Sequence, residues 1–348
     1  MQRIAFRAIL CCAAFGLGTG FATASQGDTP LEPFGLDVTV GTHHGQLLAS
    51  DGMAEDQFGA SIAISGDLAL VGAPGQDDQG KDSGAAYVFE RKNGAWTEIQ
   101  KLVPKLGGAG AQFGASVALS GDVCVVGAKN SAYVFTRTGN SFVEQELVPS
   151  NGDTYGDNST NVAIWGDTVV VGARLAAYAF VRNADTWMMQ QKLVGPADAP
   201  AGISVAIFEQ TLLASAIEES PPASGSVYVF IRNGGMWSQQ AKLVAPKPVD
   251  YDGFGESLAL TADFALIGAP RADRLSPNDT YNGVAYAFVR NQTAWSVQKE
   301  FRSDIDTNGQ DDFGRIVALS PRICIFHGRL VRQFRNRRRF SPPTLWDG

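Results

Sequence analysis

The chain has 348 residues, of which 45% are hydrophobic and 18% charged, so it can bury a core and is not generally disordered. Glycine accounts for 39 residues, well above the usual share of about 7%, which predicts many turns and short strands. The net charge is −7, although eight arginines lie between residues 315 and 348, so the central part is more acidic still. This charge argues against a nucleic-acid partner, since phosphate binding needs clustered Lys and Arg.

The N-terminus has the pattern of a secretory signal peptide. Arg3 and Arg7 precede an apolar run from Ala8 to Ala24, which ends in the small-x-small motif Ala22-Thr23-Ala24. The alternative is a membrane anchor, but this glycine-rich run of 17 residues is shorter than the roughly 20 needed to span a bilayer. We therefore expect residues 1–24 to be removed, residues 25–44 to form a linker, and the mature chain to be secreted, extracellular or periplasmic, without a membrane span.

The rest of the chain is repetitive. The segment from Phe58 to Asp67 returns almost unchanged from Phe113 to Asp122, and weaker copies begin at Asn158, Ala201, Phe254 and Phe313, 43 to 59 residues apart. A second element, Tyr-x-Phe, recurs in the first five copies, and a large aromatic residue follows each of its Phe residues seven positions later. The Tyr and Phe side chains are predicted to form the core between repeats, and the Arg that follows each pair is predicted to cap its strand or to pair with a neighbouring acid.

Each copy predicts four antiparallel strands. In the first copy these are residues 58–65, 68–73, 85–91 and 96–103, with a tight turn at Ser65-Gly66-Asp67 and a hairpin at Asn93-Gly94. Four-stranded units that cannot bury both faces alone stack radially, which predicts the blades of an all-β propeller over residues 45–326.

These residues carry a family resemblance. Phe58-Gly59 with Gly72-Ala73-Pro74, and Phe254-Gly255 with Gly268-Ala269-Pro270, resemble FG-GAP repeats, which occur in the integrin α-subunit propeller and in many secreted microbial proteins. The resemblance implies a non-catalytic propeller for extracellular adhesion or protein recognition, with calcium as a structural ion. Alternatives are a carbohydrate-binding propeller, with Tyr155, Tyr251 and Tyr281 as sugar-stacking candidates, and an accessory domain of an extracellular hydrolase.

The ends of the repeat region leave the number of blades at six or seven. Residues 46–49 resemble a fourth strand with no blade before it, and the copy that begins at Phe313 has only its first two strands. A fourth strand from the N-terminus would close the last blade. Residues 327–348 are basic and lack the repeat pattern, so we expect a disordered or frame-shifted tail.

Variable loops indicate the functional face. The loop between strands two and three and the connector to the next blade share one face, and both differ in length between copies. Acidic residues are enriched there, which favours cation binding. The acids are Asp51, Glu55, Asp56, Asp77, Asp78, Asp82, Asp153, Asp157, Asp250, Asp252, Asp273, Asp279, Asp304, Asp306, Asp311 and Asp312.

The most specific metal-site prediction is at residues 304–312. Asp304, Asp306, Asn308 and Asp312 place oxygen donors at positions 1, 3, 5 and 9 of this segment, and Gly309 at position 6 permits a sharp turn. The segment is similar to the integrin-propeller calcium loop, although it lies before the Phe-Gly pair rather than between strands one and two. A solvated acidic turn is the alternative.

Two further predictions concern covalent chemistry. Cys124 and Cys324 occupy the same strand-two position of the second and sixth copies, so they should be too far apart for a disulfide and remain buried thiols. Asn158, Asn278 and Asn291 begin glycosylation sequons, which matter only in a host that glycosylates. No catalytic constellation emerges, because the Gly-x-Ser pattern at Ser61 recurs at other repeats.

Overall fold

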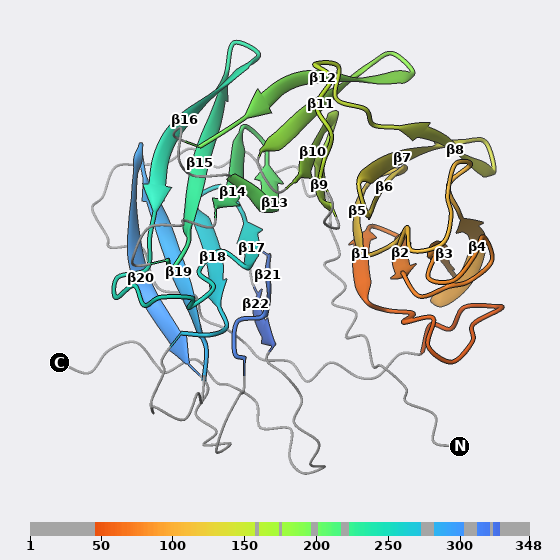
Figure 1. Cartoon of the computed structure of the whole chain (residues 1–348), viewed down its shortest axis with the longest axis horizontal. Coiled ribbons are helices and arrows are strands. Elements are labelled where there is room, and N and C mark those ends of the chain that lie inside the picture. Colours follow the sequence, from red (N-terminus) through yellow and green to blue (C-terminus); the bar gives the residue numbers. More distant parts are fainter. Residues whose placement is uncertain are drawn as a thin grey trace.

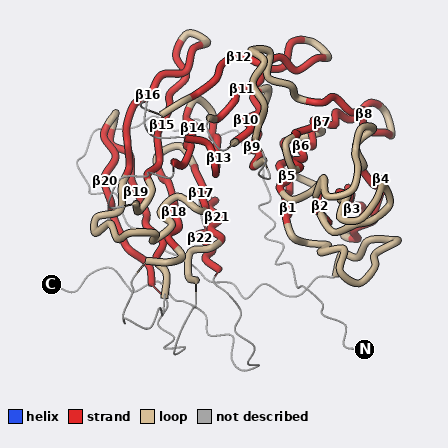
Figure 2. The backbone as a smooth tube through the Cα atoms, viewed as in Figure 1, coloured by secondary structure: helices blue, strands red, loops and turns tan. Residues whose placement is uncertain are grey.

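The computed structural model describes most of the repeat region. All the regular secondary structure of the described residues is β-strand (Figure 2). Among these residues there is no helix long and apolar enough to cross a membrane. The signal peptide, the 25–44 linker and the tail after His327 lie outside the described residues, which are 46–156, 160–173, 176–195, 201–216, 223–272, 282–302, 312–320 and 323–327.

The strands form five four-stranded antiparallel sheets and one two-stranded sheet, each in sequence order. The first three sheets are β1 (Ser61–Ser65), β2 (Leu68–Ala73), β3 (Ala85–Lys92), β4 (Ala95–Leu102); β5 (Ser116–Ser120), β6 (Val123–Ala128), β7 (Ser131–Thr138), β8 (Ser141–Glu146); and β9 (Asn161–Trp165), β10 (Thr168–Gly172), β11 (Ala177–Asn183), β12 (Thr186–Leu193). The others are β13 (Ala201–Phe208), β14 (Thr211–Ala216), β15 (Ser226–Asn233), β16 (Met236–Leu243); β17 (Ser257–Leu260), β18 (Phe264–Ala269), β19 (Val284–Asn291), β20 (Ala294–Arg302); and β21 (Ile316–Ser320), β22 (Ile323–His327).

The sheets follow one another around a common centre as the blades of a propeller (Figure 1). The first strand of each blade is innermost, and each lies beside the first strand of the next blade, from β1 through β5, β9, β13 and β17 to β21. The all-β propeller predicted from the repeats is therefore confirmed. Five blades are complete among the described residues, and the sixth has two strands.

For strands two to four of the first blade, the predicted limits agree with the structure to within one residue. The predicted start of strand one is too early. β1 begins at Ser61 because Gln57 and Gly59 have positive φ values of 57° and 90°, which break the extended conformation. The Gly59 amide instead donates to the Gly72 carbonyl at 2.9 Å. At the other end of the repeat region, β22 extends through His327, one residue past the predicted limit.

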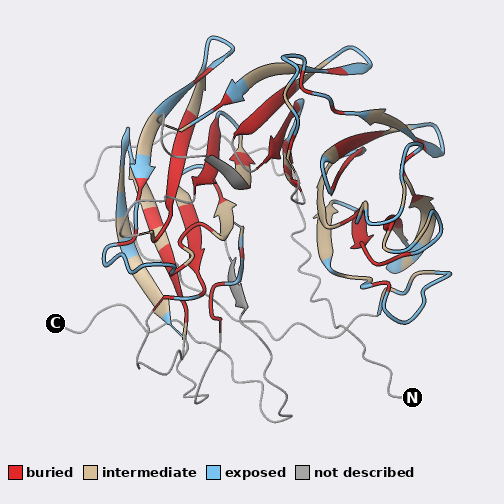
Figure 3. Ribbon diagram, in the orientation of Figure 1, coloured by how far each residue is buried: buried red, intermediate tan, exposed pale blue. Residues whose placement is uncertain are grey.

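The core lies between blades, as the Tyr-x-Phe pattern predicts. Tyr87 and Phe89 are 0% and 2% exposed, and the corresponding residues of the other four complete blades are equally buried (Figure 3). Phe113, from the Phe-Gly pair of blade two, packs on Tyr133 and Phe135 and also on residues of β2 and β3 in blade one. The Phe-Gly segments of blades two, five and six therefore contribute to the layer between two blades.

The two glycines of the repeat motif meet at the same place. Gly72 of blade one faces Gly114 of blade two so closely that a Cβ atom on Gly72 would overlap the Gly114 carbonyl oxygen. The Ser61 hydroxyl donates to that oxygen at 2.7 Å. Blades five and six repeat this arrangement with Gly268, Gly314 and Ser257, again at 2.7 Å. We call this contact the FG–GAP joint.

The predicted partner of the Arg after Tyr-x-Phe is also present. Arg91 pairs with Asp67 of the Ser-Gly-Asp turn at 2.8 Å and lies over the Trp96 ring. Arg290 lies within 3.6 Å of Asp263 and over Trp295 in the same way. In all five complete blades the backbone amide of this Arg donates to the turn residue, so the pair links the two hairpins of one blade.

Glutamine side chains link the outer strands of neighbouring blades. The Gln191 side-chain amide in β12 exchanges two hydrogen bonds of 2.9 Å with the Trp237 backbone in β16. The next residue back, Gln190, accepts from the Trp237 indole N–H at 3.1 Å. Gln190 is an extra residue at a bulge in β12, opposite Ala179 and Phe180.

Strand β8 has no such bulge, and its absence leaves a buried donor without a partner. β8 pairs with β7 in unbroken register. Among the described residues, no group accepts a hydrogen bond from the Trp187 indole N–H, although Trp187 is only 4% exposed. A one-residue deletion in strand four of blade two therefore explains the unsatisfied indole of blade three.

Residues 46–49 are not the fourth strand that the sequence predicts. They have no strand conformation and pair with no sheet, and Ser50 donates instead to Glu98 of β4 through its backbone amide (2.8 Å) and its hydroxyl (2.9 Å). Leu47 nevertheless packs into the core of blade one, as Leu102 packs into that of blade two. The segment keeps the packing of a strand-four end without its backbone pairing.

The cysteine register is as predicted. Cys124 in β6 is paired with Leu119 in β5, and Cys324 in β22 is paired with Leu319 in β21. Both cysteines therefore hold the same position in strand two, four blades apart. Cys124 is a free, fully buried thiol, and burial raises its pKa far above the ordinary value. The side chain of Cys324 lies outside the described part of the chain.

Candidate functional site

The acids of the loop-and-connector face form ion pairs with lysines from strand four. Lys101 of β4 reaches both Asp51 and Asp78 at 2.5 Å, and the Tyr87 hydroxyl donates to Asp51 at 2.8 Å. Blade three repeats this network with Lys192, Asp153 and Tyr178. Hydrogen bonds from Lys101 hold the pKa of both Asp51 and Asp78 below the ordinary value, and Lys192 does the same for Asp153.

Other acids of this face bind backbone amides and so shape the connectors. Asp56 and Asp252 both lie two residues before a Phe-Gly pair, and both are buried. Asp56 accepts from the Met53 amide at 2.7 Å, and Asp252 accepts from the Phe254 amide at 2.9 Å. Burial raises the pKa of Asp252 despite these bonds. The acidic enrichment noted in the sequence therefore serves, at these positions, to brace the connectors.

Only one of the four predicted calcium ligands lies in the described residues. Asp312 is 8% exposed, and its carboxylate lies 3.4 Å from the guanidinium of Arg315. Its φ of 48° matches the left-handed conformation of Gln57, Gln112 and Gly253, which also precede a Phe-Gly pair. Asp304, Asp306 and Asn308 lie outside the described residues. Within the residues placed by the structure, no group of three His, Cys, Asp or Glu could hold a metal ion.

The same face exposes large apolar side chains on its connectors. An exposed aliphatic residue follows the buried Leu at the end of strand four at Val148 (60% exposed), Val194 (52%) and Val244 (46%), and Leu48 (64%) follows the partly buried Leu47 in the same way. The longer connectors add the exposed residues Met53, Leu106, Val249 and Tyr251. This connector face, defined by these eight residues, combines apolar side chains with the braced acids.

The three proposed sugar-stacking tyrosines do not form a common surface. Tyr155 is 4% exposed, packs edge-on against Tyr178, and donates its hydroxyl to the Leu147 carbonyl, so it cannot stack on a ligand. Tyr251 is 74% exposed. Tyr281 lies outside the described residues, as do the sequon positions Asn158 and Asn278. Asn291 is exposed at the end of β19.

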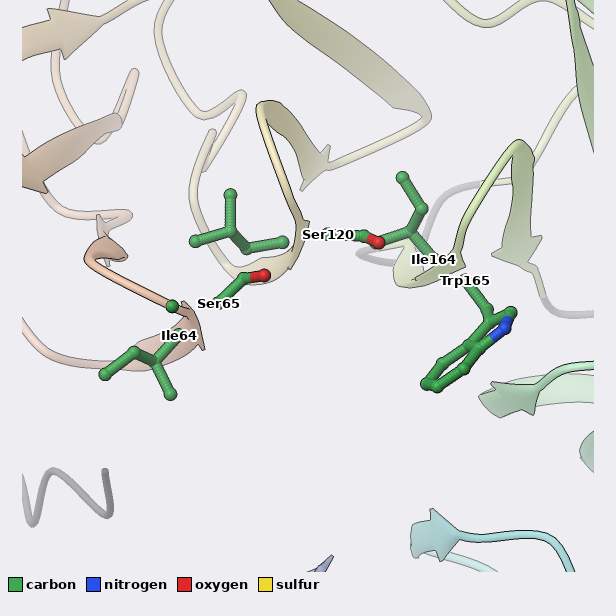
Figure 4. Close-up of a pocket in the computed structure, with 7 residues that line it drawn as sticks. Ile64, Ser65, Ser120, Ile164 and Trp165 are labelled. Atoms are coloured by element: carbon green, nitrogen blue, oxygen red, sulfur yellow. The ribbon is translucent and has the colours of Figure 1, made fainter. Parts of the chain in front are cut away.

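A pocket lies on the opposite face, where the first strands of blades one to three end (Figure 4). Its volume is about 200 Å³, and its lining comes from three successive blades: Ile64, Ser65, Gly66, Leu119, Ser120, Ile164 and Trp165. Ser65, Ser120 and Trp165 are the last residues of β1, β5 and β9. Sequence reasoning missed this pocket, although a Trp where two copies carry Ser was a visible signal.

Trp165 forms one wall of this pocket and is partly exposed to solvent. Its side chain is 39% exposed, and its ring centroid lies 4.2 Å from that of Phe208, the last residue of β13. Two successive blades therefore carry aromatic residues at a position where blades one and two carry serine. On the other side, the Ser65 hydroxyl accepts from the Gly121 amide at 3.0 Å, which fixes its position between two blades.

The fold and these joints define the class of the molecule as a β-propeller. A structural comparison agrees: 76% of the chain aligns with 75% of a provisionally assigned 6-phosphogluconolactonase from Bacteroides uniformis, with a TM-score of 0.51 and 14% sequence identity. At that identity the likeness concerns the fold alone. A comparison with curated proteins finds no match.

The repeats themselves identify the protein further. The FG-GAP repeat family matches residues 42–89, 96–144 and 237–288. The chain therefore carries FG-GAP repeats at three positions, as the Phe-Gly and Gly-Ala-Pro elements predict.

Proposed function

We propose that this chain is a secreted, non-catalytic propeller that binds an extracellular protein through its connector face, in adhesion or recognition. The observation that carries the proposal is the set of exposed apolar side chains on the connectors, which includes Leu106 at 80% and Tyr251 at 74% exposure. Exposed apolar groups that gather on one face are typical of interaction sites, whereas single ones need no explanation. The FG-GAP repeats, found in extracellular proteins, support the same reading.

The bracing of the connectors favours this face for binding. The Lys101 and Lys192 networks and the buried carboxylates of Asp56 and Asp252 hold the connectors in place before any partner arrives. A pre-organised surface loses less conformational entropy on binding. A structural calcium ion at Asp304, Asp306, Asn308 and Asp312 belongs to the proposal as well, and would order the connector before the sixth blade.

The experiment is an adhesion assay with matched variants. Beads coated with the mature chain are settled on cells of the source organism and washed under shear. The pair Leu106→Asp and Tyr251→Asp should reduce retention to that of albumin-coated beads. The control pair Met188→Asp and Met236→Asp changes residues of similar exposure on strand four and should retain binding. Equal retention by both pairs, or none by the unaltered chain, would refute the proposal.

A further inference from the structure

The pocket on the face opposite the connectors is lined by an exposed tryptophan, Trp165. The fold of its own blade does not require a tryptophan at this position. Trp165 ends β9 at the position held by Ser65 in blade one and Ser120 in blade two, and those blades form the same strand and turn with serine. The indole packs at a tilt of 42° against Phe208, and with 39% of Trp165 exposed, part of its ring faces solvent. Trp165 alone therefore supplies the aromatic wall of the pocket, with Phe208 supporting it from the next blade.

The remaining lining of the pocket is small and partly polar. Ser65 and Ser120 contribute hydroxyl groups, Gly66 contributes turn backbone, and Ile64, Leu119 and Ile164 complete the lining. The Ser65 oxygen already accepts from Gly121, so its own proton remains available to donate. Figure 4 shows Ser65 and Trp165 on opposite sides of the opening, with Ser120 and Ile164 between them.

The charges around the pocket restrict the ligand. No lining residue is charged, and the turns that follow Ser65 and Ser120 carry Asp67 and Asp122, whose side chains are 66% and 68% exposed. Both carboxylates lie beside an arginine of their own blade, Arg91 and Arg137, so these turns present no unbalanced charge that would favour an ionic ligand. The volume of about 200 Å³ is also below the roughly 300–1,000 Å³ of sites for drug-sized molecules, so the pocket takes a single ring.

We propose that this pocket binds one neutral pyranose residue, the terminal sugar of a glycan, with the apolar face of the sugar on Trp165 and its hydroxyls towards Ser65 and Ser120. A pyranose has an apolar C–H face and a rim of hydroxyl groups, which matches an aromatic wall opposite hydroxyl donors and acceptors. The site is independent of the connector face, since it lies on the other side of the propeller and shares none of its residues.

The test is saturation-transfer NMR with a panel of neutral methyl pyranosides at millimolar concentration, followed by titration calorimetry of those that bind. At least one pyranoside should receive saturation on its ring protons. Trp165→Ser, which installs the residue of blades one and two, should weaken binding by about tenfold or more, equivalent to about 1.4 kcal/mol. Tyr251→Ala, an exposed aromatic on the connector face, should leave the affinity unchanged.

Three outcomes would overturn the proposal: no saturation of any pyranoside, unchanged affinity in Trp165→Ser with a wild-type melting temperature, or displacement of the sugars by indole with tighter binding. The last would identify an aromatic peptide side chain as the ligand. Trp165→Phe controls for folding, because it keeps an aromatic ring beside Phe208 and should retain part of the affinity. Bead adhesion should be unaffected by Trp165→Ser, so the two proposals can fail separately.

Discussion

Blades with the complete repeat motif and blades that have lost it are joined in different ways. Between blades one and two, and between five and six, glycine faces glycine and a serine hydroxyl closes the contact at 2.7 Å. At the junction of blades two and three, Thr160 stands near Gly127 and donates to the Ala128 carbonyl at 3.1 Å. Between blades four and five, Ser215 occupies the glycine position beside Gly255, and the Ser204 hydroxyl of β13 donates to the Glu256 carbonyl at 2.8 Å.

The comparison shows that the motif is a joint between blades. Where one of the two glycines is lost, a hydroxyl group still donates to a backbone carbonyl of the neighbouring blade, and the inner strands remain neighbours. The repeat therefore tolerates sequence change as long as backbone groups at the joint stay satisfied, since unpaired buried polar groups are costly. The two proposed binding sites lie on the two faces, where the copies differ.

The largest effect is expected at the FG–GAP joint. Gly72→Ala places a methyl group against the Gly114 carbonyl and the Ser61 hydroxyl, both held by the neighbouring strands. Overpacking of this kind should lower the free energy of unfolding by about 3 kcal/mol, measured by denaturant titration.

Gly108→Ala is the matched control, because nothing lies within 4 Å of the added methyl group and the backbone has no positive φ. It should change stability by less than about 0.5 kcal/mol. Similar losses in the two variants would contradict the joint.

A second prediction is that the connector before blade six differs from the other connectors in binding calcium. If Asp304, Asp306, Asn308 and Asp312 bind the ion, millimolar calcium should raise the free energy of unfolding by about 1.4 kcal/mol, as expected for an ion at ten times its Kd. The measurement is a thermal melt with calcium against chelator. Asp306→Ala should abolish the shift; an unchanged wild-type midpoint removes the site, and a shift that persists in the variant moves it elsewhere.

Two tryptophans sharpen the comparison between blades three and four. Trp237→Phe removes the bond from the indole to Gln190, whereas Trp187→Phe removes a buried N–H for which the described residues provide no acceptor. Both indoles are 4% exposed, so the loss of apolar burial is similar. Chemical denaturation should therefore show Trp237→Phe to be more destabilising by about 1 kcal/mol. Equal losses would mean that Trp187 has an acceptor after all.

The smallest effect concerns pH. Because Lys101 lowers the pKa of Asp51 and Asp78, the pairs contribute stability above the unfolded pKa of about 3.9, and this is lost as pH falls through the lower folded values. Lys101→Met should cost about 1 kcal/mol or less at pH 7, since both carboxylates are about half exposed. The difference from wild type should vanish at lower pH. Lys129→Met, at an exposed position, should follow the wild-type profile.

The repeat pattern was enough to predict the blades, the strand order and the buried Tyr-x-Phe pairs, because period-two patterns and tight turns are local signals. It could not predict that residues 46–49 lie beside blade one without pairing, because backbone pairing depends on a partner strand. Tyr155 looked like an exposed loop aromatic, yet it replaces the lost Phe of blade three by packing on Tyr178. The Trp165 pocket needs three blades side by side, so no single repeat reveals it.

The central claim is that the Phe-Gly segments of blades two, five and six dock on the preceding blade, and amide hydrogen exchange tests it most directly. The amides of Phe113, Phe254 and Phe313 donate to Ser83, Ser224 and Asn282 of the blade before, at 3.0, 3.0 and 3.1 Å. We predict that these three amides exchange as slowly as those of the central strands β2, β6 and β18, and that their protection falls together with that of the strands as denaturant is added. Rapid exchange of the three amides while the strands stay protected would contradict the account.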